Sequence, residues 1–219
     1  MKLSVPSVVQ PKKSVDCGVA CVAMLLEYYG VSYDYKKLRK EIAVLRCGTS
    51  SPQLGSYLLK HGFEVEIVTM HPSLFDLRSR FEAKEKMLKY LKSFRGKMKP
   101  KLNITVLEHF IEFVKAGGKL TPRVPTVEDM REEIVAKRPL ISLLTHQFLY
   151  KSRMKPQFTF HFHVITGVDS QSVYVNDPDW EEEFGGQRKH RINDYLYAIY
   201  ASAYGALDNA SIMKVKRRS

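Results

Sequence analysis

An apolar segment that begins at a cysteine constrains this chain more than any other feature. Asp16-Cys17-Gly18 opens a run that continues to Tyr29 and meets a glycine at Gly30, so residues 17–29 read as a helix with a cysteine in its first turn. Unpaired N–H groups and the positive end of the helix dipole stabilise a thiolate at such a position. The remainder of the chain then has to supply a base.

Helical patterns dominate the first part of the chain, and strand patterns dominate the last part. We expect further helices at residues 33–43, 53–61, 74–94, 106–116, 126–137 and 192–204, and strands at 63–68, 140–144, 158–168, 172–176 and 211–215. Because strands and helices do not alternate regularly, the order favours an α+β fold over a doubly wound sheet. It predicts a mainly helical N-terminal lobe packed on a C-terminal antiparallel sheet.

The length and the cysteine content indicate one globular domain in a reducing compartment. We expect residues 1–219 to form a single domain, with 70–128 as a helical insertion between the lobes and 214–219 as a basic tail. No apolar run is long enough for a membrane span or a secretory signal, which favours a cytoplasmic location. Cys17, Cys21 and Cys47 are too few for a disulfide framework or a four-thiolate zinc site, so no cofactor or metal is predicted.

The chain carries a clear surplus of positive charge. Lys and Arg number 35 against 23 Asp and Glu, for a formal net charge of +12. Such a surplus allows weak binding of polyanions through the basic surface. Because no nucleic-acid recognition motif accompanies the charge, a solvated basic face is the favoured interpretation.

Candidates for the base and for its orienting group lie in the strand region. His161 and His163 are two residues apart on one predicted strand, so their side chains project from the same face. Asp177 ends the next predicted strand, and an antiparallel hairpin brings it alongside the histidines. A thiol nucleophile needs such a base, and the base needs a group that holds its far nitrogen. The same residues are also zinc ligands, but a first-turn cysteine favours catalysis.

Three short motifs give the chain a resemblance to the C39-like cysteine peptidases of the papain-like superfamily, here as a stand-alone domain. They are Gln10 with Asp16-Cys17-Gly18, then the strand from His161 to Asp169, then Asn176-Asp177-Pro178. These resemble the family's cysteine box, histidine strand and Asn-Asp-Pro strand end, in the family's order. The resemblance covers residues 8–70 and 137–216, and it says nothing about the segment between them, which could shape the substrate cleft.

The resemblance implies a role for each matching residue. Cys17 is the nucleophile, His161 the general base and acid, and Asp177 the residue that orients the histidine. Gln10 and the backbone N–H of Cys17 form the oxyanion hole. Gln10 departs from the pattern, because it lies seven residues before Cys17 where the family usually has six, and the intervening loop must absorb the extra residue.

Other residues are expected beside the catalytic ones. The family spacing to Gly167 selects His161 over His163 as the base, although His163 on the same face stays an alternative. We expect His163, Gly18 and Trp180 to line the substrate-binding cleft. Cys21, one turn after Cys17, is interpreted as an inert buried thiol.

The expected activity is hydrolysis of peptide or amide bonds through a thioester acyl-enzyme, with a peptide or protein as substrate. Two alternatives remain open. The same groups could serve an acyltransferase of the transglutaminase-like or phytochelatin-synthase-like kind, in which an amine or a thiol replaces water. Alternatively, the domain could be a non-catalytic module that binds peptides or polyanions on the same fold.

Overall fold

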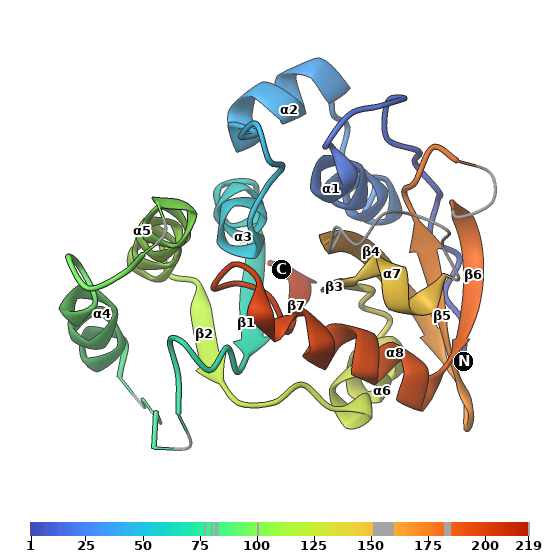
Figure 1. The fold of residues 1–219 in the computed structure, drawn as a ribbon. Coiled ribbons are helices and arrows are strands. Elements are labelled where there is room, and N and C mark those ends of the chain that lie inside the picture. Colours follow the sequence, from blue (N-terminus) through green and yellow to red (C-terminus); the bar gives the residue numbers. More distant parts are fainter. Residues whose placement is uncertain are drawn as a thin grey trace.

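The computed structural model describes residues 1–76, 78–79, 81, 83–99, 101–150, 160–181 and 185–218. Figure 1 shows the elements in chain order. They are α1 (Cys17–Tyr28), α2 (Tyr35–Ile42), α3 (Ser51–Lys60), β1 (Phe63–Thr69), α4 (Lys84–Ser93), α5 (Lys101–Lys115), β2 (Lys119–Pro122), α6 (Val127–Val135), β3 (Leu140–Thr145), α7 (His146–Leu149), β4 (Phe160–Val168), β5 (Ser172–Asp177), β6 (Gly186–Arg191), α8 (Ile192–Tyr200), the 3₁₀ turn η1 (Ala201–Tyr204) and β7 (Ser211–Arg217).

The strands form a mixed sheet in the order β2-β1-β7-β3-β4-β5-β6. All neighbours pair antiparallel except β1 and β2, which run parallel. The α+β class is therefore confirmed. The sheet reaches further than predicted, because β1 from the N-terminal part pairs along its whole length with β7, from Phe63 opposite Arg217 to Thr69 opposite Ser211. This pairing joins a strand from the N-terminal third of the chain to the last strand in one sheet.

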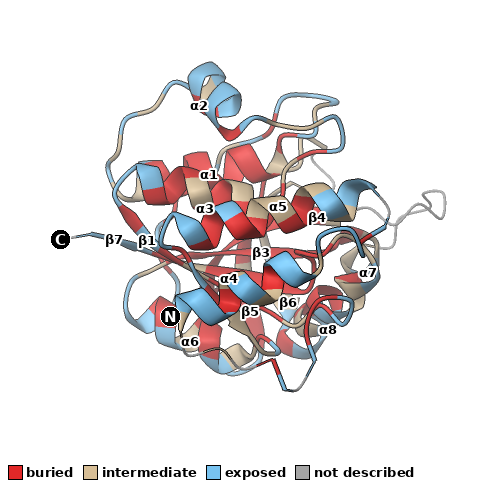
Figure 2. Ribbon diagram, turned by 90° about the vertical axis from the view of Figure 1, so that its left-hand side faces the viewer, coloured by how far each residue is buried: buried red, intermediate tan, exposed pale blue. Residues whose placement is uncertain are grey.

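Helices cover the sheet on both sides. In the view of Figure 1, α1, α2 and α3 lie above it, whereas α6 and α8 lie below it. Helix α1 packs on β4 and α3 packs on β1, while α8 packs on β3. Figure 2 shows α1 almost entirely buried and α2 largely exposed, which agrees with the unbroken burial of residues 18–26. The buried side chains form one continuous core, so the cysteine helix is fixed by its neighbours.

Local sequence signals explain where several helices begin and end. Ser50 and Gln53 form a capping box at the start of α3, and Thr126 and Asp129 form another at α6. Gly30 follows α1 with φ of 67°, a conformation that glycine adopts without strain. The predicted helices at these positions are confirmed within a few residues. Within the described residues, no helix combines the length and the apolar character that crossing a membrane requires.

Two predicted helices differ from the structure: the one predicted at 106–116 begins earlier, at Lys101, and the one at 74–94 is shorter. The predicted helix at 74–94 is wrong in its first half, since helix α4 covers only its second half. Leu74 and Phe75 are buried as members of a turn in which both N–H groups donate to the His71 carbonyl, and Leu77 lies outside the described residues. The predicted strand at 158–168 begins at Phe160 among the described residues, and Phe158 lies outside them.

The basic C-terminal segment is part of the sheet. Residues 214–217, expected as the start of a tail, complete β7 instead. The reason is the backbone pairing with β1 together with side-chain contacts at alternate positions. Lys214 Nζ lies 2.7 Å from Asp129 Oδ1, and Lys216 Nζ lies 3.4 Å from Glu64 Oε2.

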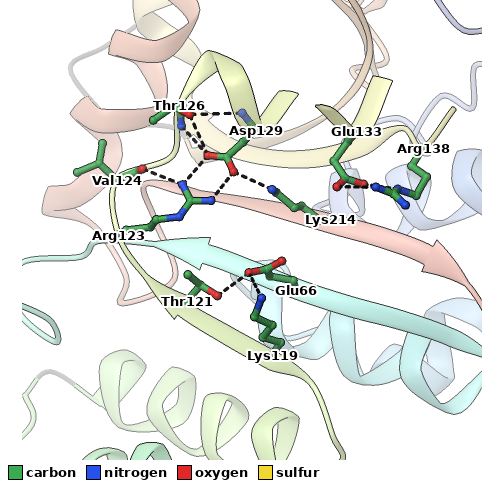
Figure 3. A network of polar contacts seen from close by, with 10 residues as sticks. All are labelled: Glu66, Lys119, Thr121, Arg123, Val124, Thr126, Asp129, Glu133, Arg138 and Lys214. Carbon is green, nitrogen blue, oxygen red and sulfur yellow. Dashed lines mark hydrogen bonds and ion pairs between the residues drawn. The ribbon is translucent and has the colours of Figure 1, made fainter. Parts of the chain in front are cut away.

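A network of charged contacts links β7 to α6 and to the segment after β2 (Figure 3). The buried Asp129 carboxylate accepts hydrogen bonds from both terminal nitrogens of Arg123 and from the Thr126 N–H, and it pairs with Lys214. Burial raises the pKa of Asp129, but these donors outweigh it and lower the pKa below its ordinary value. Across the parallel pair, Glu66 contacts Lys119 at 3.0 Å.

We expect Asp129→Asn to lower the free energy of unfolding by about 1.5–3 kcal/mol near neutral pH, the range for hydrogen bonds to charged groups. The folded-state pKa of Asp129 lies below the value of about 3.9 of an unfolded aspartate. The contribution is therefore complete above about pH 5 and is lost as the pH falls through the folded-state pKa. Urea unfolding at several pH values measures both effects.

Glu128→Gln is the matched control for this variant. Glu128 is on the same helix turn but pairs with Arg131 at the surface, where both side chains are exposed, so its loss should cost less than about 1 kcal/mol. An Asp129→Asn variant that is as stable as Glu128→Gln at pH 7 would contradict the structural role of the network.

Candidate active site

The end of β5 organises the candidate site, and each residue of Asn176-Asp177-Pro178 has a different contact. The Asn176 side-chain amide donates to the Val5 carbonyl at 2.9 Å and to the Pro6 carbonyl at 3.1 Å. The Pro178 carbonyl accepts from the Gln10 N–H at 2.8 Å. The first ten residues are thereby tied to the same strand end that carries Asp177.

The N-terminal segment also pairs with β4. The Leu3 N–H donates to the Thr166 carbonyl at 2.7 Å, and the Val168 N–H donates to the Met1 carbonyl at 3.0 Å. Between them, a Cβ atom at Gly167 would lie 2.7 Å from the Met1 carbonyl oxygen and 2.8 Å from the Lys2 Cα. Glycine is required there because the two backbones approach too closely for a side chain.

The Asp177 carboxylate is fully buried and is surrounded by donors. Its Oδ1 lies 2.7 Å from His161 Nε2 and accepts from the Asp179 N–H at 2.9 Å. Its Oδ2 accepts from the Tyr150 hydroxyl at 2.9 Å and lies 2.9 Å from His163 Nε2. Burial raises the pKa of Asp177, but the neighbouring histidines reverse this and hold the pKa far below its ordinary value. Asp177 is therefore a carboxylate at any pH near neutral.

Cys17 is the first residue of α1 and is partly exposed. The residue before it, Asp16, is buried and makes no capping hydrogen bond, because its carboxylate pairs with Arg39 Nε at 2.8 and 3.0 Å. This ion pair fixes the start of the helix on α2. It also leaves the N–H groups of the first turn uncapped by that side chain, as an oxyanion site requires.

His161 lies between the sulfur and the carboxylate. Burial alone would lower the pKa of His161, but the charges of Asp177 and of the Cys17 thiolate, and hydrogen bonding to both, raise it well above the ordinary value. Since its Nε2 is engaged by Asp177, the ring presents its other nitrogen to Cys17. The geometry is that of an imidazolium that can pair with a thiolate and pass on a proton.

His163 contacts the same carboxylate but does not line the cleft. The sequence predicts it as a cleft neighbour, whereas the structure buries it completely. Its Nε2 faces Asp177 Oδ2, and its Nδ1 lies 3.4 Å from the Tyr195 hydroxyl, which in turn is 2.6 Å from Ser142 Oγ. Burial lowers the pKa of His163, so this ring is neutral. Its contact with Oδ2 helps to hold the Asp177 carboxylate in place.

Gln10 lines the same cleft as Cys17 and His161. The extra residue between Gln10 and Cys17 is accommodated by a turn. In this turn the Ser14 N–H donates to the Pro11 carbonyl, and Lys13 adopts a positive φ of 59°. The side chain of Gln10 is buried, and its Oε1 has no hydrogen-bond partner among the described residues. Gln10 thus places a polar amide group at the cleft.

Gly18 and Trp180 lie outside the lining of this cleft, contrary to the prediction. Gly18 is buried, and a Cβ atom there would lie 2.3 Å from Thr49 Oγ1 and 2.9 Å from Leu54 Cδ1, so the glycine serves close packing of the helix start. The ring of the half-buried Trp180 is contacted by Lys12 Nζ at 5.4 Å from its centroid, a cation–π contact to the loop that precedes α1.

The cleft has a volume of about 410 Å³, and residues from distant segments of the chain line it. Loop residues 45–50 form one part, and Leu102 and Val106 of α5 form another, so the segment 70–128 does contribute to the cleft. Asp208 is a further lining residue, which accepts from the Ser51 N–H at 2.7 Å. Burial raises its pKa to about 6, which brings the titration of this carboxyl group closer to neutral pH.

Two residues of the site are missed in the sequence analysis. Tyr150 donates to Asp177, and His146 Nε2 lies 3.6 Å from Asp177 Oδ2. Both follow β3, whose register places Leu144 opposite His161. The sequence does show a histidine, His146, two residues after the strand predicted at 140–144. It does not show that this strand pairs with the strand that carries His161, and so the approach of His146 to Asp177 could not be predicted.

Comparison with known proteins gives one family match and structures of similar fold. Residues 6–96 match the model of the Peptidase C39 family. A putative C39-like peptidase from Bacillus anthracis shares the fold at 14% identity, with 100% of this chain and 99% of that chain covered and a TM-score of 0.56. The peptidase domain of Streptococcus ComA, a bi-functional ABC transporter involved in quorum sensing, matches at 14% identity, 97% and 98% coverage and a TM-score of 0.51. The comparison with curated proteins found no match.

The family match covers the segment that carries Gln10 and Cys17, and the two structures share the fold of the remainder. The resemblance to C39-like peptidases and their papain-like fold is therefore confirmed. The roles of the individual site residues are not tested by these comparisons and stay predictions.

We expect the pKa of His161 to fall in both Asp177→Asn and Cys17→Ala, because each variant removes a negative charge that favours the imidazolium. NMR titration of the imidazole signals measures the shift without any substrate. His71, whose pKa is lowered by burial, serves as the internal control and should titrate unchanged. A His161 pKa that stays the same in Asp177→Asn would contradict the contact between the two side chains.

Proposed function

We propose that the protein is a cysteine hydrolase that cleaves peptide bonds through Cys17, His161 and Asp177. The observation that carries the proposal is the position of His161, which contacts a buried carboxylate with one nitrogen and interacts with the first-turn cysteine. A thiolate, an acid and base, and an orienting carboxylate are the groups that acyl transfer to sulfur requires.

The mechanism follows from these positions. The Cys17 thiolate attacks the carbonyl carbon of the scissile bond, and the resulting oxyanion accepts hydrogen bonds from the Cys17 N–H and the Gln10 side-chain amide. Protonated His161 gives its proton to the leaving amine as the C–N bond breaks. His161 then takes a proton from water, which attacks the thioester and releases the acid product and the thiolate.

The walls of the cleft support a peptide or protein as the substrate. Residues of loop 45–50 and of helix α5 line the same cleft as Cys17, and Leu45, Leu102 and Val106 make part of the lining apolar. A peptide can occupy such a surface in an extended conformation, using its main-chain groups for hydrogen bonds and its side chains for contacts such as those with Leu102 and Val106. The match of the N-terminal part to a peptidase family favours the same substrate class.

Active-site variants test the assignment. We expect Cys17→Ala and His161→Ala to abolish turnover, Asp177→Asn to reduce it less completely, and Gln10→Ala to lower kcat by about 10²–10³-fold, the usual effect of losing one oxyanion donor. Peptides are first identified with a library of electrophilic peptide probes, in which mass spectrometry maps the modified residue. Cleavage of the matching peptides then gives kcat for each variant.

Cys47→Ser is the matched control, because Cys47 lines the same cleft but does not begin a helix. Labelling of Cys47 in place of Cys17, or turnover that survives Cys17→Ala, would contradict the proposal. A Cys17 that reacts with iodoacetamide no faster than an unstructured thiol would favour a non-catalytic binding module. A product joined to an added amine acceptor would favour an acyltransferase.

A further inference from the structure

We propose that His146, His161, His163 and Asp177 form a binding site for a divalent transition-metal ion of the zinc type. This inference goes beyond the proposed hydrolase function. It concerns the far side of the catalytic histidine, where three imidazoles converge on one carboxylate. Among the described residues, one ligand atom from each of the four lies within 4.8 Å of the ligand atoms of the others.

The distances around the carboxylate suit a small tetrahedral ion. Asp177 Oδ2 lies 2.9 Å from His163 Nε2 and 3.6 Å from His146 Nε2, and Oδ1 lies 2.7 Å from His161 Nε2. Ligands at about 2.0–2.1 Å from Zn²⁺ are roughly 3.3 Å apart in a tetrahedron. The nitrogen–oxygen distances lie on both sides of this value, and the four ligand atoms together lie within 4.8 Å of one another, so the imidazoles must rotate inward to enclose the ion.

The chemistry and the burial of the four groups favour the same ligand. Imidazole nitrogen with one carboxylate is a donor set that zinc and related ions prefer. The side chains of His163 and Asp177 are fully buried, and those of His161 and His146 are 6% and 10% exposed. A cation inside such a cluster faces a compensating negative charge at its centre and is shielded from competing water.

Groups outside the cluster hold one imidazole in the orientation that a metal ligand needs. His163 Nδ1 faces the Tyr195 hydroxyl, which Ser142 contacts in turn. In the metal-bound form, a His163 ring that donates its Nδ1–H to that hydroxyl has its Nε2 lone pair available for the ion. Metal-binding histidines are commonly supported in this way through their second ring nitrogen.

Occupation of the site has a consequence for the proposed catalysis, and this consequence alone rests on the proposed function. The ion takes the Nε2 atom of His161 and the carboxylate of Asp177, the two groups whose contact orients the catalytic ring. The metal-bound form is then unable to cycle His161 between base and acid. The cluster would make the hydrolase sensitive to inhibition by zinc.

The experiment measures metal binding directly. Metal-free protein is titrated with Zn²⁺ by calorimetry and with Co²⁺ by visible absorption, where tetrahedral coordination gives intense d–d bands. We expect one ion per chain. His146→Ala and His163→Ala should each weaken binding by more than the roughly 10–100-fold that loss of an outer-shell partner costs, and Tyr195→Phe should weaken it by about that range.

Two control variants separate the site from its neighbours. His190→Ala removes a histidine whose ring stacks 6.3 Å from that of His163 but which is not part of the cluster, and it should leave the affinity unchanged. Cys17→Ala should also retain the ion. Circular dichroism and thermal unfolding verify that each variant is folded, and His163→Gln replaces His163→Ala if the latter is not.

Three results would overturn the inference. The first is that the protein binds no stoichiometric ion, and the second is that the wild type and His146→Ala bind the ion equally well. The third is that Cys17→Ala loses the ion while the wild type shows a sulfur-to-cobalt charge-transfer band. The last result would place the ion on the cysteine and histidine pair. Because none of these readouts requires turnover, failure of the hydrolase proposal would leave the metal result interpretable.

Discussion

A single buried negative charge determines much of this structure. Removing the Asp177 carboxylate from water costs several kcal/mol unless both oxygens are well hydrogen-bonded. The donors come from three parts of the chain, namely β4 with its histidines, the α7 region with Tyr150, and the backbone of Asp179. Satisfying the charge therefore requires the sheet order and the turn after β3 to be correct together. The same requirement orients His161, so the stability of this region and the geometry of the candidate site have one physical origin.

Most of the candidate site could be predicted from the sequence because its signals are local. A helix that begins at Cys17, two histidines in one strand and an aspartate at a strand end are patterns of a few residues each. His146 and Tyr150 could not be found in this way, since their approach to Asp177 depends on the pairing of β3 with β4. Whether His163 faces the cleft or the interior likewise depends on the twist of the sheet and on Tyr195, which lies 32 positions further along the chain.

The fold was less predictable at the edges of the sheet than at its centre. Strand β6 reads Gly-Gln-Arg-Lys-His-Arg and β2 has four residues, so neither shows the apolar alternation that indicates a strand. The apolar positions of residues 74–94 have helical spacing, yet Leu74 and Phe75 reach the core from a separate turn. Periodicity identifies which side chains are buried here, but it does not distinguish one long helix from a turn followed by a shorter helix.

The close approach at Gly167 links remote positions to the cleft. Residues 1–3 lie along β4 there, Asn176 holds residues 5 and 6, and the same segment ends at Gln10, which lines the cleft together with Cys17. Any side chain at position 167 would push this segment outward and carry the proposed oxyanion donor with it. In a genetic screen, such an allele would resemble a substitution in the proposed catalytic residues, although position 167 is not one of them.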